Sequence, residues 1–152
     1  MGTLHLLSVL VMLTSGLIAG VFFDVALAML PAFMGMTPGR FIYTNNTIGK
    51  GYHPTMPIVC STTVVVNLTL FLLTDGPHRY LFLIATLLVA GTMVVSEFGN
   101  MRINRVLLKI DPENVPAGWQ DPRARWRAYH LIRTALAVLA VAVNGIAVVL
   151  AG

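Results

Sequence analysis

The chain has 152 residues, of which 57% are hydrophobic and only 11% are charged. A water-soluble domain carries roughly 25% charged residues, so this composition excludes an ordinary soluble fold and indicates that much of the surface faces the lipid bilayer. The net charge of +4 would also suit a nucleic-acid partner, but the basic residues form no patch interleaved with aromatic side chains, so we expect no nucleic acid.

Four apolar stretches long enough to cross a bilayer follow one another along the chain. The hydrocarbon core is about 30 Å thick, which takes about 20 residues at a rise of 1.5 Å per residue. We predict spans over residues 4–30, 56–74, 80–97 and 128–151, with Pro31 closing the first and a long connector over residues 98–127. The predicted fold is therefore all-α, a four-transmembrane-helix bundle that forms one domain over residues 1–152.

The basic residues lie mostly on one side of this bundle. Every lysine and arginine except Arg79 falls in or beside the first and third connectors. An even number of spans places these two connectors on the same side, and the positive-inside rule makes that side cytoplasmic. Both termini are then on the non-cytoplasmic side. We expect a multi-pass integral protein of a bacterial cytoplasmic membrane.

Two carboxylates fall inside predicted spans, Asp24 and Glu97. A charged side chain there costs about 2.5 to 3.5 kcal/mol on insertion scales, so we expect each of the two to have a structural or functional role. Asp24 continues a stripe of small residues at four-residue spacing that includes Gly16 and Gly20. Membrane helices approach one another along such stripes. We therefore predict that Asp24 faces the bundle interior, and that the chain forms a homo-oligomer.

The fourth span opens with His130, Arg133 and Thr134, which share one helical face because they are three and four residues apart. Asp24 and Glu97 end their helices on the same side. We predict one polar pocket at the cytoplasmic ends of the helices, formed by Asp24, Glu97, Asn100, Asn104, His130 and Arg133. For Asp24 or Glu97 with Arg133, a structural ion pair that holds the helices together is as well supported by the sequence as a catalytic role.

Three segments carry a family resemblance. They are residues 16–23 (GLIAGVFF), residues 100–104 (NMRIN) and residues 126–134 (WRAYHLIRT). In this order the chain resembles the anthrone-oxygenase-like family of small four-helix membrane proteins, which shows G-x-x-x-G-V-F-F, N-V-P-L-N and W-x-x-W-N-x-x-R-T. Three positions depart from that pattern: Arg102 stands for the proline, Tyr129 for the second tryptophan and His130 for the asparagine.

The resemblance implies an oxygenase that uses dioxygen as cosubstrate to convert a lipophilic anthrone to an anthraquinone, a biosynthetic oxidoreductase activity. On that basis the leading hypothesis is a membrane-embedded oxygenase acting on a lipophilic aromatic small molecule. Asp24, Glu97 or His130 would remove a carbon-bound proton, and Arg133, Asn100 and Asn104 would stabilise the resulting enolate.

Two alternatives stay open. In a metal-dependent version, His53, His130 and Glu97 or Asp24 would form a two-histidine, one-carboxylate site for iron or copper. In the other, the chain is a small transporter or an accessory membrane subunit, in which Asp24, Glu97 and Arg133 form a path for a proton or a substrate.

Overall fold

The computed structural model describes residues 2–151, which contain helices and connecting segments but no strand. The elements in chain order are α1 (Thr3–Asp24), the π-helical turn η1 (Val25–Met29), α2 (Leu30–Gly35), α3 (Pro38–Tyr52), α4 (Thr55–Leu73), α5 (Arg79–Val95), the π-helical turn η2 (Ser96–Met101), α6 (Arg102–Leu107) and α7 (Arg123–Ala151). The all-α prediction is confirmed.

Four continuous helical segments are long and apolar enough to cross a membrane. They are Thr3–Gly35, Thr55–Leu73, Arg79–Leu107 and Arg123–Ala151. The prediction of four spanning helices is thus confirmed, and their length and composition fit a multi-pass membrane protein. Leucines such as Leu72, 73% exposed, and Leu27, 68% exposed, cover the outside, which suits contact with lipid tails.

The first helical segment continues beyond its predicted end. Pro31 was expected to close it, but α2 runs on to Gly35. The π-helical turn η1 ends at Met29, so Pro31 occupies the first turn of a new α-helical segment. The wider π-helical turn just before Pro31 accommodates the proline, because the regular hydrogen-bond ladder is already interrupted where its N–H is missing.

Most of the first connector is also helical, which hydropathy alone did not indicate. Helix α3 spans Pro38–Tyr52 and buries Phe41, Ile42 and Asn45, while its other side is polar or exposed. The third connector is shorter than predicted, because η2 and α6 extend the α5 segment to Leu107 and α7 begins at Arg123. The bundle therefore has additional helical structure at the end where the first and third connectors lie.

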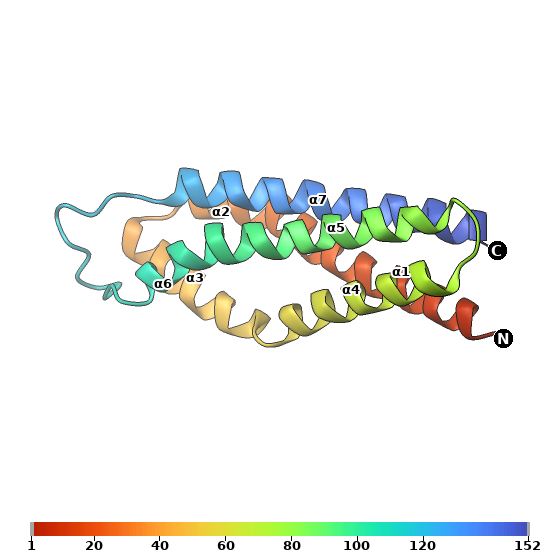
Figure 1. Cartoon of the computed structure of the whole chain (residues 1–152). Coiled ribbons are helices and arrows are strands. Elements are labelled where there is room, and N and C mark those ends of the chain that lie inside the picture. The colour runs from red at the N-terminus through yellow and green to blue at the C-terminus, as the bar shows by residue number, and fades with distance from the viewer. Residues whose placement is uncertain (1, 152) are drawn as a thin grey trace.

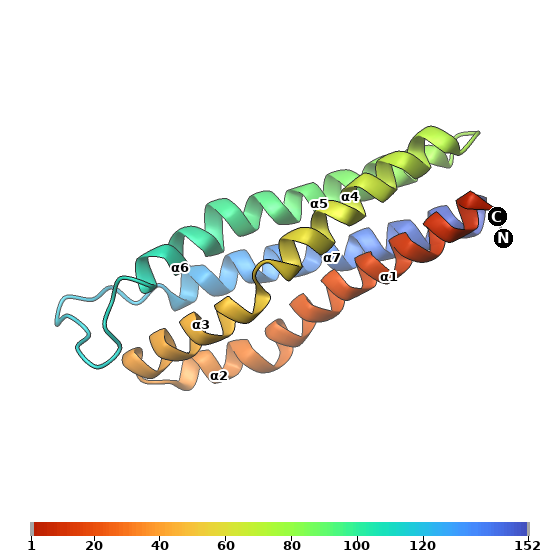
Figure 2. The ribbon, with the colours of Figure 1, turned by 90° about the horizontal axis from the view of Figure 1, so that it is seen from below.

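Each helix of the bundle packs against two neighbours. Helix α1 contacts α4 and α7, and α5 contacts the same two helices, so α4 and α7 lie diagonally opposite. Both termini lie at one end of the bundle and the connector after α6 lies at the other (Figures 1 and 2). We call the latter the basic end, because it carries Arg40, Lys50, Arg102, Arg105, Lys109, Arg123, Arg125 and Arg127.

The basic end has its own apolar core, which holds the short helices in place. Phe33 of α2, Phe41 of α3, Leu107 of α6 and Trp126 of α7 belong to one buried cluster. Arg123 ties the same elements together at the surface, since its guanidinium donates to the backbone carbonyls of Phe33 (2.8 Å) and Met36 (2.6 Å). The Phe33 carbonyl also accepts from the Met36 N–H at 3.3 Å, so the arginine adds a second donor there and a donor for the Met36 carbonyl just beyond the C-terminus of α2.

A close approach between η2 and α7 fixes the spacing of these two elements. A Cβ on Gly99 would lie only 2.6 Å from the Tyr129 ring, whereas a Cβ on Gly91, in the same helical segment, would lie 3.5 Å from Leu136. The first distance is a clash and the second an ordinary van der Waals contact.

We therefore expect Gly99→Ala to lower the free energy of unfolding by about 1–3 kcal/mol relative to Gly91→Ala, the cost typical of overpacking. Both substitutions bring the same gain in helix propensity, so their difference isolates the clash. The measurement is reversible unfolding in detergent micelles followed by circular dichroism. Equal stability of the two variants would show that Tyr129 can move away without cost.

Candidate functional site

His130 lies at the centre of the polar residues that the structure brings together. It is 0% exposed, and its Nε2 lies 2.9 Å from the backbone carbonyl of Phe22. Thr134 Oγ1 donates to the same carbonyl at 3.3 Å. Phe22 lies just before the π-helical turn η1, where the regular hydrogen-bond ladder of α1 is interrupted. Such turns occur frequently at functional sites.

The second ring nitrogen of His130 faces Arg133. The guanidinium Nε and Nη2 of Arg133 lie 3.0 Å and 2.7 Å from His130 Nδ1. Because a guanidinium can only donate and a carbonyl can only accept, Nδ1 is the acceptor and Nε2 carries the proton. His130 is therefore neutral in this arrangement and links α1 to the Arg133 side chain.

Arg133 is held by two further contacts. Its Nη1 donates to Ser96 Oγ at 3.2 Å, at the start of the second π-helical turn, η2. Its guanidinium also lies over the Phe22 ring, 4.5 Å from the ring centroid. A cation so far into a span needs such partners, because an unpaired charge there is costly. Both π-helical turns thus border the arginine.

Trp126 extends the network toward the basic end. Its ring stacks on His130 with an interplanar angle of 3° and a centroid distance of 5.3 Å, and its Nε1 donates to Asn104 Oδ1 at 2.9 Å. Asn45 Nδ2 donates to the same oxygen at 3.2 Å. Asn100 Nδ2 donates to the Trp126 backbone carbonyl at 2.9 Å. The two asparagines of the NMRIN segment therefore hold Trp126 in place against His130.

Asp24 does not face the interior as predicted. It is exposed, because Ile18 and Phe22 supply the buried face of α1 and two residues along a helix correspond to about 200° of rotation. The stripe of Gly16, Gly20 and Asp24 therefore points away from α7. A Cβ on either glycine would meet no atom within 4 Å, so no helix within residues 2–151 packs directly on these glycines.

The same stripe forms one wall of a groove of about 580 Å³. Asp24 and Tyr52 line its polar end, and Met12, Leu13 and Leu17 line its apolar part. Burial raises the pKa of the Tyr52 hydroxyl, the Asp24 carboxylate raises it further, and Arg133 acts in the opposite direction. Tyr52 thus lies within electrostatic range of both the groove carboxylate and the buried arginine.

The remaining predicted residues lie outside this group. Glu97 is about half exposed and forms an ion pair with Arg105 at the surface. His53 is exposed as well. Across residues 2–151, no three His, Cys, Asp or Glu side chains are close enough to hold a metal ion, so His53, His130 and Glu97 do not meet as ligands. The predicted convergence of Glu97 and Asp24 on Arg133 was wrong, because both carboxylates lie on the outside.

Four residues of the site carried no assigned role in the sequence analysis. Trp126 and Ser96 contact the His130 and Arg133 pair, Asn45 joins the asparagine group, and Tyr52 lies beside Asp24. Trp126 could have been found from its place in the WRAYHLIRT segment, four residues before His130 on one helical face. Asn45 and Tyr52 gave no such signal, because α3 was not predicted.

The comparisons with known proteins give one result. A family model described as Anthrone oxygenase matches residues 45–143, about two thirds of the chain. The matched range contains Asn45, Asn100, Asn104, Trp126, His130 and Arg133, and it excludes Phe22 and Asp24. Neither a curated protein nor a solved structure matches the chain.

We expect His130→Leu to destabilise the protein by about 3 kcal/mol, since it removes two buried hydrogen-bonded contacts worth about 1–3 kcal/mol each once a partner is left unpaired. His130→Asn should recover part of this loss, because an amide can still donate and accept. Unfolding in detergent measures both variants. A His130→Leu protein as stable as the unmodified chain would show that the Arg133 contact does not hold the helices together.

Proposed function

Because the chain belongs to the anthrone oxygenase family, we propose that it is a membrane-embedded oxygenase that oxidises a lipophilic aromatic small molecule with dioxygen. The observation that supports this most directly is the position of the family match. It covers the connected group from Asn45 to Arg133, all but the Phe22 carbonyl on α1, so the matched segment supplies most of the polar network around His130.

The proposed reaction converts a methylene group of an anthrone-type substrate to a carbonyl. One dioxygen is consumed: one oxygen atom enters the product and the other leaves as water with the two methylene hydrogens. Removing the first proton gives an anion delocalised onto the carbonyl oxygen on the opposite side of the central ring, and this anion can reduce dioxygen directly. The protein then has to supply a base for the carbon-bound proton and donors for the anionic oxygen.

Asp24 is the best candidate for the base. Of the three groups suggested by the sequence, Glu97 is occupied by Arg105 at the surface, and the free lone pair of His130 accepts from Arg133. Asp24 makes no ion pair within residues 2–151 and opens into the groove. Its carboxylate is therefore free to accept a proton from a substrate bound in the groove.

Tyr52 would stabilise the anionic oxygen directly, and Arg133, which does not line the groove, would act on it only at longer range. Tyr52 shares the groove with Asp24, and its hydroxyl is held near Met29 Sδ at 3.8 Å. Arg133 supplies the positive charge behind it, as its effect on the pKa of Tyr52 indicates. His130, Trp126, Asn100 and Asn104 then act as positioning residues, because their contacts orient Arg133 and no free donor of theirs points into the groove.

The groove suits a lipophilic aromatic substrate in size and lining. Its volume of about 580 Å³ would hold an aromatic molecule, and because the groove is open on one side, lipid would cover the rest of that molecule. Its walls are mainly apolar side chains of α1, with the polar pair at one end. Since this face of α1 points away from the bundle interior, a substrate dissolved in the bilayer could enter from the side without crossing water.

No observation favours the transporter alternative. A path for protons or polar substrates would run through the bundle interior and connect Asp24, Glu97 and Arg133. The structure instead leaves both carboxylates on the outer surface, and only Arg133 points inward.

The test is dioxygen uptake by the purified chain in lipid nanodiscs supplied with anthrone, with anthraquinone followed by absorbance. We expect Asp24→Asn to lower the turnover rate at least roughly 100-fold, the contribution typical of a general base. Asp75→Asn, which removes a carboxylate at the opposite end of the bundle, should leave the rate unchanged.

Three results would count against the proposal. If no anthrone supports dioxygen uptake, the activity itself is wrong. If Glu97→Gln abolishes turnover while Asp24→Asn does not, the base is misassigned. If Asp75→Asn has the same effect as Asp24→Asn, the loss reflects a general change in the membrane protein.

A further inference from the structure

We propose that a second pocket, at the basic end, binds the phosphate headgroup of an anionic phospholipid. The pocket has a volume of about 530 Å³ and lies between η2, α6, the connector and the start of α7. The lining residues that matter for this proposal are Phe98, Arg102, Trp119, Gln120, Arg125 and Tyr129. It is separate from the groove that holds Asp24.

The charge of this pocket is positive and uncompensated. Arg102 and Arg125 both line it, and none of its lining residues is acidic. The ion pairs within residues 2–151 involve other arginines, Arg105 with Glu97 and Arg123 with Asp121. Two guanidinium groups without a carboxylate partner form a site for an anion, and the fork of an arginine matches the oxygens of a phosphate.

The pocket lies at the depth of lipid headgroups. Arg102 is about 35 Å along its helix from Arg79, and Arg125 is about 39 Å along α7 from Ala151, at a rise of 1.5 Å per residue. The hydrocarbon core measures about 30 Å, and the bilayer with its headgroup layers about 40–45 Å. With Arg79 and Ala151 at one membrane surface, both guanidinium groups fall in the headgroup layer of the opposite leaflet.

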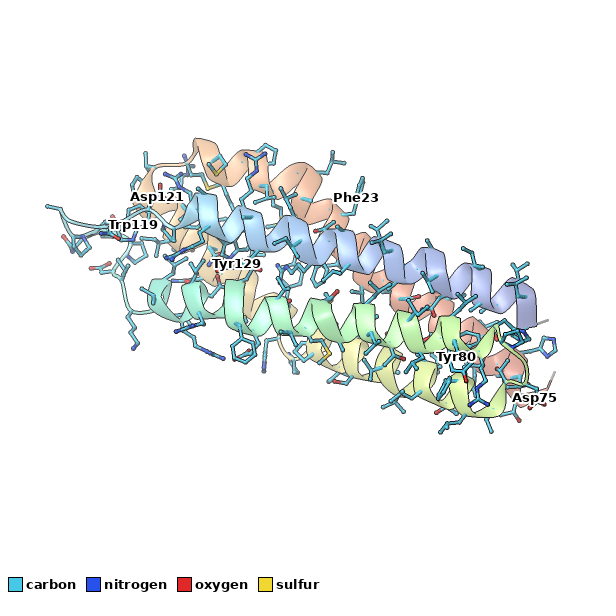
Figure 3. All side chains as sticks on the ribbon, turned by 45° about the horizontal axis from the view of Figure 1, so that its top comes forward. Phe23, Asp75, Tyr80, Trp119, Asp121 and Tyr129 are labelled. Carbon is cyan, nitrogen blue, oxygen red and sulfur yellow. The ribbon has the colours of Figure 1, made fainter. Side chains whose placement is uncertain are left out.

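The surroundings of the two arginines favour a lipid over a free anion. Phe98 is 68% exposed beside the pocket and lies one helical turn nearer the bilayer centre than Arg102, so an acyl chain has an apolar surface to cover below the headgroup. Trp119 and Tyr129 border the pocket at the same end of the bundle (Figure 3). Aromatic side chains of these two types prefer the interface between lipid and water, and basic pockets between membrane helices bind anionic headgroups.

The close contact of Gly99 with Tyr129 gives the pocket a fixed wall. The Tyr129 ring rests directly on the backbone of η2, where even a methyl group would clash. The ring is therefore held in place, and the hollow beside it belongs to the packed fold.

The experiment measures lipid retention by native mass spectrometry of the whole chain released from neutral detergent. The protein is mixed with palmitoyl-oleoyl phosphatidylglycerol or with the zwitterionic phosphatidylcholine of the same chains. The variant Arg102→Gln with Arg125→Gln is compared with Arg40→Gln with Arg127→Gln, which removes the same charge from the same end but from residues outside the pocket.

We expect the unmodified chain and the control variant to retain phosphatidylglycerol in preference to phosphatidylcholine, and the pocket variant to retain roughly 10-fold less of it. Equal losses in the two double variants would overturn the proposal, since charge alone would then explain binding. Displacement of phosphatidylglycerol by low millimolar inorganic phosphate would overturn it too, in favour of a site for free phosphate.

A second measurement keeps the proposal testable if the pocket variant does not fold. The chain has two tryptophans, and Trp126 is buried while Trp119 lines the pocket. Phosphatidylglycerol brominated near its headgroup should quench the Trp119 fluorescence, obtained as the difference from Trp119→Phe, several-fold more than the equivalent phosphatidylcholine. Equal quenching by the two lipids would contradict a headgroup site.

Discussion

The contact between His130 and Arg133 is the constraint on which the rest of the structure depends. A guanidinium near the middle of a helical bundle must be paired, and the structure pairs it with a neutral histidine in place of a carboxylate. The other nitrogen of that histidine is bound to the Phe22 carbonyl. A single side chain therefore joins α1 to α7 and holds the charge at one place between them.

Several local features follow from this pairing. The π-helical turn η1 lies just beyond Phe22, and the turn η2 brings Ser96 to Arg133. The Trp126 ring stacks on the His130 ring. Asn104 accepts from the indole N–H of Trp126, and Asn100 donates to its backbone carbonyl. His130, Arg133 and the Trp126 indole all have hydrogen-bond partners, which lowers the cost of placing polar groups so deep in a membrane protein. Together these contacts hold the Arg133 side chain in one orientation.

The two sites that we propose occupy different parts of the bundle: the groove runs along the middle of the first helical segment, and the pocket lies at the basic end. The groove beside Asp24 opens to the lipid and is mainly apolar, whereas the pocket beside Arg102 and Arg125 is basic and lies at headgroup depth. A lipophilic substrate and a bound phospholipid would both approach through the bilayer. Their separation means that activity and lipid binding can be tested independently.

The sequence alone determined the membrane class and the four spanning helices, because the length and apolar character of a span follow directly from the thickness of the hydrocarbon core. It also identified the His130 and Arg133 face, since spacing on a helix fixes which residues are neighbours. Only the tertiary structure decided which face of each helix points toward the bundle interior. The rotation of α1 placed Phe22 inside and Asp24 outside, and helix α3 brought Tyr52 to that groove. Spacing within one helix leaves its rotation against the others open, because that depends on which of its faces packs best.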